Sequence, residues 1–382
     1  MVNNKRIIRA ATIDWSVDFF RDVMIRMREK GYDMVAMSSP GKFLTALKTD
    51  YGFKIIEVPM SRQISPLNDC RALFRLVRTF RCEKPYVVHS ITPKAGLLCM
   101  LAAWITRVPV RIHTFTGLVW PTATGIKRRV LMMTDKTICA CATHIIPEGE
   151  GVKNDLHTHI THKPMKVLGY GNVMGVDMEL WNPLRFSDIK KDKEIFQFLF
   201  TGRIVGDKGI NELVNAFVLL QKKYPNIRLM LTGPYEKDLD PLLPETDAEI
   251  SKNKTIVVNG PFFGDDLVRI YAQADCYIMP SYREGFPNSV LEAGAMGLPQ
   301  IVTDINGSRE IITNEENGLI VPSKDEEALY DAMERILTDE QLRLRLKANA
   351  RNMIANRFER SFVQKCQLDF YEEVLNSKEQ HV

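Results

Sequence analysis

Glu284 and Glu292, which are eight residues apart, are the two residues of this chain whose type and spacing best suit a ligand-binding or catalytic role. An apolar strand over residues 276–279 leads into a polar loop with Glu284, and a helix that carries Glu292 follows. A helix start offers free N–H groups and positive dipole, which suit a phosphate or a polar sugar. A carboxylate one turn deeper can accept two hydrogen bonds from a vicinal diol such as ribose. For a bare pair of glutamates, the simpler interpretation is a solvated acid and a helix-dipole acid.

Two cations, Arg203 and Lys208, follow an apolar strand that begins at residue 196. The local pattern is G-R-x4-K-G, and an amphipathic helix comes next. Two fixed cations at the carboxyl end of one strand can hold a diphosphate and stabilise its charge as it leaves. Two ordinary surface cations are the alternative.

The string around the two glutamates, EGFPNSVLEAGAMGLP, is far more specific than the pair alone. It resembles the E-x7-E donor motif of glycosyltransferase family 4, whose members have the two-domain B-type fold. G-R-x4-K-G matches the same family, and so do the segments L-T-G-P, V-N-G and D-x-x-G-x-x-E after later strands. The resemblance implies that Arg203, Lys208 and Glu284 act in catalysis. It also implies a donor-binding set of Gly202, Arg203, Lys208, Gly233, Gly260, Glu284, Gly285, Phe286, Pro287, Asn288, Ser289 and Glu292.

The reaction implied by the resemblance is sugar transfer with retention of anomeric configuration, from a UDP- or GDP-sugar. No metal and no further cofactor is expected, and the absence of an Asp-x-Asp motif in a matching loop fits this expectation. Arg203 and Lys208 are expected to stabilise the leaving diphosphate. A nucleotide-sugar 2-epimerase on the same scaffold is one alternative. The other is a non-catalytic module that binds nucleotide sugars.

The first half of the chain offers weaker candidates for an acceptor site. Two strand ends carry H-S-I-T-P-K-A-G and I-H-T-F-T-G-L, and their loops are expected to face the cleft. The first strand is followed by I-D-W-S-V-D, without glycine. Many family members have a Gly-Gly loop there and a histidine where Thr116 stands. These departures resemble a bacterial branch that builds capsule, exopolysaccharide and other glycans on an undecaprenyl-diphosphate carrier. The candidate acceptor residues are Trp15, Thr92, Lys94, His113 and Thr114. A hydrogen-bonded structural role is the alternative for His113.

Short apolar runs alternate with helical patterns along the whole chain, which predicts parallel sheets with crossover helices. The pattern breaks at residues 169–187, a stretch rich in Gly, Asn and Pro. We therefore expect an α/β protein of two doubly wound, Rossmann-like domains, the acceptor domain at 1–180 and the donor domain at 181–357. The resemblance implies that the last helix, 358–376, crosses back onto the first domain. The cleft between the domains is the expected site.

Charge is unevenly distributed along the 382 residues. Residues 1–180 have 26 Lys and Arg against 15 Asp and Glu, whereas residues 181–382 have 25 against 32. A basic half predicts an anionic partner, and we expect peripheral contact with an anionic membrane surface. A solvated basic surface without a specific partner is the alternative. Nucleic acid is not expected, because no aromatic-interleaved basic motif is present.

Seven scattered cysteines lack paired metal spacing and fit a reducing compartment. No run of about 20 apolar residues predicts a membrane-spanning helix, and the start shows no cleavable secretory signal. The expectation is a cytoplasmic protein, peripheral on the inner face of the cell membrane.

Overall fold

The computed structural model describes residues 5–61, 65–187, 189, 191–192, 194–237 and 240–377. The chain forms two compact units. Unit 1 comprises residues 1–174 and 363–382, and unit 2 comprises residues 175–362. The boundary after residue 174 lies six residues before the one taken from the sequence.

Unit 1 is built on a six-stranded, wholly parallel sheet with the order β3-β2-β1-β4-β5-β6. The strands are β1 (Arg6–Ala10), β2 (Asp33–Ser38), β3 (Lys54–Glu57), β4 (Val87–Ile91), β5 (Val110–Phe115) and β6 (His144–Pro147). The central strand β4 is buried along its whole length, as expected for a parallel sheet covered on both faces.

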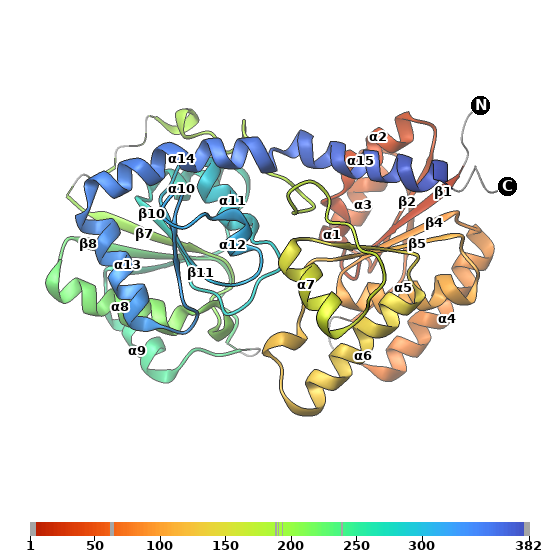
Figure 1. Cartoon of the computed structure of the whole chain (residues 1–382), viewed down its shortest axis with the longest axis horizontal. Helices are drawn as coiled ribbons and strands as arrows, with labels where there is room; N and C mark the ends of the chain where they lie inside the picture. Colours follow the sequence, from red (N-terminus) through yellow and green to blue (C-terminus); the bar gives the residue numbers. More distant parts are fainter. Residues whose placement is uncertain are drawn as a thin grey trace. The chain divides into compact units, whose positions relative to one another are not determined.

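Helices cover both faces of this sheet (Figure 1). One apolar core lies under α4 (Pro66–Glu83), α5 (Pro93–Ile105), α6 (Gly125–Cys141) and α7 (Glu150–His159). The other lies under α1 (Asp14–Asp18), α2 (Arg21–Glu29), α3 (Lys42–Thr49) and the carboxyl-terminal α15 (Arg360–Ser377). A short 3-10 turn, η1 (Trp120–Thr122), precedes α6.

Unit 2 repeats the design, with the order β12-β11-β10-β7-β8-β9 and all pairs parallel. Its strands are β7 (Phe196–Thr201), β8 (Ile227–Thr232), β9 (Ile256–Asn259), β10 (Cys276–Met279), β11 (Gln300–Thr303) and β12 (Leu319–Val321). Its helices are η2 (Pro183–Phe186), η3 (Gly206–Lys208), α8 (Ile210–Lys223), α9 (Pro244–Lys252), α10 (Gly264–Gln273), α11 (Asn288–Ala295), α12 (Ser308–Ile311), α13 (Glu326–Thr338) and α14 (Glu340–Phe358).

The two doubly wound sheets confirm the fold class expected from the sequence. The segment after β1 forms two helices, because α1 ends at Asp18 and α2 begins at Arg21. Phe20 turns inward between them and lies under the Arg9 guanidinium, 3.8 Å from ring centroid to charge. Among the described residues, no helix combines the length and apolarity needed to cross a membrane.

Candidate functional site

The strand order of unit 2 reverses between β7 and β10, which are hydrogen-bonded neighbours. In open α/β sheets, ligands bind outside the carboxyl ends of the strands at such a switch point. The loops that follow β7 and β10 are in direct contact here. A Cβ atom on Gly209, which ends η3, would lie 2.1 Å from the backbone oxygen of Pro280. The left-handed backbone of Gly209, with φ at +69°, also favours glycine.

Hydrogen bonds and ion pairs connect the loop after β7 to the loop after β10. Lys208 forms an ion pair with Glu284, and each side chain is only 14% exposed. The backbone N–H of Tyr282 donates to the carbonyl of Asp207 at 2.9 Å, and Arg283 pairs with the Asp207 carboxylate at 2.9 Å. The structure thus brings together Lys208 and Glu284, which are 76 residues apart in the sequence.

Arg203 lies beside this pair at the end of β7. Its guanidinium is 3.2 Å from the Glu236 carboxylate and 3.9 Å from that of Asp207, and its side chain is 35% exposed. The turn before it is tight, because a Cβ on Gly233 would lie 2.0 Å from the oxygen of Gly202. Both glycines have positive φ, +151° at Gly202 and +142° at Gly233. The strand end can therefore bring its backbone close to a ligand.

Glu292 lies on the sheet-facing side of α11 and meets a tyrosine. The Tyr271 hydroxyl is 3.1 Å from the Glu292 carboxylate and 2.5 Å from the Thr201 hydroxyl. Burial raises the pKa of Glu292 to about 7, and the hydrogen bond from Tyr271 offsets only part of this shift. Tyr271 remains a neutral donor because burial raises its pKa well above the usual value.

The segment from Gly285 to Ser289 forms the entry to α11. Phe286 is 5% exposed and its ring lies 5.3 Å from that of Phe358, so it anchors the loop rather than pointing into solvent. Pro287 is the residue before the helix, and Asn288 is its first residue. Gly307 lies so close behind that its Cβ would be 2.3 Å from the oxygen of Gly285.

Gly260 follows β9, beside the turn at Gly233, and has no atom within 4 Å of the position of a Cβ. Glu310, in the D-x-x-G-x-x-E element, accepts a hydrogen bond from the backbone N–H of Gly307 at 3.2 Å. This contact supports its interpretation as a helix-start acid.

In unit 1 the equivalent switch point lies between β1 and β4. Thr92, with φ at +74°, bonds through its hydroxyl to that of Thr12 at 2.7 Å. Lys94 forms an ion pair with Asp69 of α4 at 2.6 Å and is 12% exposed. Trp15 of α1 is 46% exposed and stacks edge-on against Phe19.

His113 and Thr114 were expected at a strand end that faces the cleft, whereas β5 continues to Phe115 and holds both within the sheet. Consecutive strand residues face opposite sides. His113 bonds to the Ser90 hydroxyl at 2.8 Å, and Thr114 bonds to the His89 ring at 2.7 Å. Both are at most 2% exposed, and burial lowers the pKa of His113 to about 3. His113 is therefore a neutral, hydrogen-bonded core residue.

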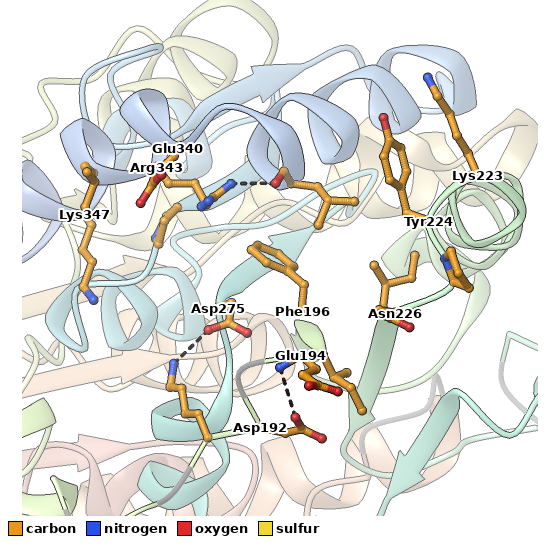
Figure 2. Close-up of a pocket in the computed structure, with 17 residues that line it drawn as sticks. Asp192, Glu194, Phe196, Lys223, Tyr224, Asn226, Asp275, Glu340, Arg343 and Lys347 are labelled. Atoms are coloured by element: carbon orange, nitrogen blue, oxygen red, sulfur yellow. Dashed lines mark hydrogen bonds and ion pairs between the residues drawn. The ribbon is translucent and has the colours of Figure 1, made fainter.

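A groove of about 620 Å³ opens at the other edge of the second sheet (Figure 2). It is lined by residues where strands begin, among them Phe196 of β7, Ile227 of β8 and Asp275 before β10. Lys191 pairs with Asp275 at 3.1 Å, and Arg343 donates to the carbonyl of Leu337 at 2.6 Å. The amino-terminal edge is thus occupied by internally bonded charges, and Arg203, Lys208, Glu284 and Glu292 are not among the residues that line this groove.

Sequence reasoning missed Tyr271 and Glu236, because each comes from an element distant in the sequence from its partner. The buried tyrosine on α10 looked like a core residue, and nothing local marks its hydroxyl. Within the described residues, no group of three or more His, Cys, Asp or Glu is placed to hold a metal ion.

The chain matches two family models that together cover most of its length. Residues 183–353 match glycosyl transferases group 1, and residues 19–171 match the glycosyl transferase 4-like domain. The capsular polysaccharide biosynthesis glycosyltransferase CapM of Staphylococcus aureus is 33% identical over 94% of each chain. This chain is a glycosyltransferase. The donor motif at Glu284 and Glu292 lies inside the group 1 match.

Other relatives of this glycosyltransferase carry more specific names. A UDP-Gal:α-D-GlcNAc-diphosphoundecaprenol α-1,3-galactosyltransferase of Escherichia coli is 27% identical over 78% of each chain. The structure of sucrose-phosphate synthase from Thermosynechococcus elongatus superposes with a TM-score of 0.80 at 19% identity, covering 98% of this chain and all of that one. Anabaena HepE in complex with UDP gives 0.77 at 14% identity, covering 96% and 100%. These structures share the two-domain B-type fold, and the matches favour transfer over epimerisation.

Proposed function

We propose that this glycosyltransferase moves a sugar, with retention of configuration, from a UDP-sugar to a sugar carried on undecaprenyl diphosphate. The relatives that act on diphosphoundecaprenol-linked sugars support the acceptor, and the name of the Escherichia coli relative supports UDP over GDP. The product would enter a capsule, exopolysaccharide or other surface glycan, as the CapM relative suggests. The enzyme would then work peripherally on the inner face of the cell membrane.

The observation that carries the proposal is the meeting of Lys208 and Glu284 at the switch point of unit 2. Lys208 and Arg203 would bind the donor diphosphate and stabilise the negative charge that develops as the bond to the sugar breaks. Glu284 would accept hydrogen bonds from sugar hydroxyls, with the N–H groups of Gly285 to Ser289 around it. The leaving diphosphate would take the proton of the attacking hydroxyl, so no protein nucleophile is needed.

Glu292 would hold the ribose of the donor. Its carboxylate lies one turn or more inside α11 and accepts one hydrogen bond from a described residue, through the Tyr271 hydroxyl. A carboxylate has about four lone-pair sites, so it can accept two more hydrogen bonds from a vicinal diol. The strand-end turns at Gly202, Gly233 and Gly260 would lie against the diphosphate and the base.

The acceptor would bind to unit 1 at the edge where β1 and β4 end. Trp15 offers an exposed ring for stacking on a sugar, and Thr92 and Lys94 lie at the same switch point. His113 and Thr114 would stabilise this edge from within the sheet and would not contact the acceptor, because neither side chain reaches solvent.

The test is to incubate the purified protein with a panel of UDP- and GDP-sugars in the presence of EDTA. We expect slow hydrolysis of one UDP-sugar, and faster transfer when an undecaprenyl-diphosphate-linked N-acetylhexosamine is added. A donor epimerised at C2, or a donor bound but neither hydrolysed nor transferred with any acceptor, would refute the proposal. Hydrolysis that stops in EDTA would refute its metal-independent form.

A further inference from the structure

Three neighbouring helices of unit 1 expose large apolar side chains that no described residue covers. Helices α4, α5 and α6 lie side by side on one side of the first sheet, and each packs against the next (Figure 1). Their outward surface, here named the α4–α6 face, carries six large apolar residues between 46% and 79% exposed. These are Leu67, Phe74, Trp104, Ile126, Val130 and Met133. Exposed apolar groups gathered in this way mark an interaction surface.

The exposed residues of α4 follow helical spacing and alternate with cations. Leu67, Arg71, Phe74 and Arg78 lie at positions i, i+4, i+7 and i+11, so they form one stripe along the helix. Leu76, on the opposite side of α4, is fully buried against the sheet. The outer stripe is thus a second, exposed amphipathic surface with basic groups placed between apolar ones.

Helix α6 repeats this arrangement. Ile126, Val130 and Met133 lie at i, i+4 and i+7, and the adjacent residues include Lys127, Arg128 and Arg129, all exposed. Trp104, 58% exposed, ends α5 between the two helices. The apolar residues of three helices therefore share one surface with a band of cations.

The α4–α6 face has almost no free negative charge. Residues 66–141 contain 12 Lys and Arg but only three Asp and Glu. Asp69 and Glu83 are held in ion pairs, and Asp135 is only 7% exposed. Arg75, Arg78, Arg81 and Arg129 are exposed and make no ion pair with any described residue. Much of the basic excess of unit 1 therefore lies in the segment that forms this face.

We propose that the α4–α6 face lies on an anionic phospholipid bilayer. In a membrane interface, apolar side chains enter the boundary of the acyl chains while Lys and Arg extend to the lipid phosphates. A surface that mixes apolar and basic residues therefore finds a favourable partner for both kinds of side chain. A tryptophan on the central helix of the face also suits the interface. A second copy of this chain fits poorly, because two such faces would place cations against cations.

With the α4–α6 face on the bilayer, the orientation of unit 1 suits an acceptor linked to a carrier lipid. This step alone rests on the proposed function. In unit 1, helices that follow a parallel strand begin at the carboxyl edge of the sheet. Leu67 and Ile126, near the starts of α4 and α6, therefore lie toward the edge that bears Thr92 and Lys94. A diphosphate linked to a lipid in the bilayer would be presented to that edge.

The experiment is co-sedimentation of the full chain with vesicles, without donor or acceptor. Vesicles of phosphatidylglycerol and phosphatidylcholine are compared with vesicles of phosphatidylcholine alone. One variant, Arg75→Glu/Arg129→Glu, reverses charge on the face, and another, Phe74→Ser/Met133→Ser, removes apolar groups. The matched controls are Arg26→Glu/Lys48→Glu, on α2 and α3 of unit 1, and Leu219→Ser/Leu344→Ser, on α8 and α14 of unit 2.

We expect the chain to bind anionic vesicles and the charge variant to bind them roughly 30-fold more weakly, since each cation near the surface contributes about 1 kcal/mol. The apolar variant should also lose at least about tenfold in binding, and both controls should stay within about twofold of the parent chain. Equal binding to neutral vesicles, unchanged binding by both face variants, or a face variant that alters only the oligomeric state measured by light scattering would overturn the proposal. Thermal unfolding of each variant verifies folding, and donor hydrolysis tests the proposed function separately.

Discussion

The two sheets have the same strand order, yet their switch points are built from different chemistry. At β7 and β10, the loops meet through charged side chains, Lys208 with Glu284 and Arg283 with Asp207. At β1 and β4, the loops meet through two hydroxyls, Thr12 and Thr92. Equal topology therefore sets where a ligand binds, whereas the loop residues decide what kind of ligand it is.

The difference extends to the backbone. The first strand of unit 2 is followed by Gly202. Its backbone oxygen lies so close to Gly233 that a Cβ atom at position 233 would not fit. The first strand of unit 1 leads into α1 without a glycine and presents the exposed ring of Trp15 instead. Under the proposed function, the first edge would bring bare backbone to a diphosphate, and the second would bring an aromatic ring to a sugar.

The largest effect should come from removing the lysine of the charged switch point. Lys208→Ala should lower donor hydrolysis roughly 100-fold or more, because a cation on a leaving diphosphate acts most strongly in the transition state. Lys94→Ala is the matched control, since it also breaks a half-buried pair with a carboxylate, Asp69, at the other switch point. It should leave hydrolysis without acceptor within about threefold of the parent. If Lys208→Ala and Lys94→Ala lowered donor hydrolysis to a similar extent, the proposed functional difference between the two edges would be contradicted.

The second effect tests the backbone. Gly233→Ala should lower the free energy of unfolding by about 3 kcal/mol, because φ is +142° and the added Cβ meets the oxygen of Gly202. Gly260→Ala should change it by less than about 0.5 kcal/mol, because no atom lies within 4 Å of the new Cβ. Thermal unfolding followed by calorimetry separates the two. A harmless Gly233→Ala would mean that the two strand-end turns do not need the close approach described.

Residues contiguous in sequence could be predicted well. The loop and helix over residues 280–299 carry their own strand, turn and helix signals, so Glu284 and Glu292 could be placed before any tertiary contact was known. Tyr271 and Glu236 could not, because their contacts depend on how α10 and the loop after β8 pack.

The contacts of His113 and Thr114 in unit 1 were hidden for the same reason. Both residues were expected at a strand end that faces the cleft, and β5 runs past them to Phe115. The hydroxyl of Ser90 and the ring of His89 satisfy them inside the sheet, and a sequence pattern cannot show such partners.

The smallest predicted effect is a pH dependence that belongs to one switch point alone. Glu292 has a pKa of about 7, raised by burial, whereas His113 in the other unit has a pKa of about 3 and stays neutral above that. Ribose hydroxyls donate to the ionised carboxylate, so affinity for UDP-glucose should rise about tenfold from pH 6 to pH 8. Calorimetric titration measures this rise, and the diester phosphates of UDP-glucose do not titrate in that range.

Glu292→Gln should bind more weakly at pH 8 and lose the pH dependence, whereas His113→Gln should keep it. The stability of the free protein should change in the opposite direction. The pKa of Glu292 is raised from 4.5 to about 7 in the folded state. Between these two pH values, the carboxyl is therefore more protonated in the folded state than in the unfolded chain. The free energy of unfolding should therefore fall as pH rises between these two values, and Glu292→Gln should remove that decline. A rise in affinity that survives Glu292→Gln would assign the titration to another group and remove ribose binding from this residue.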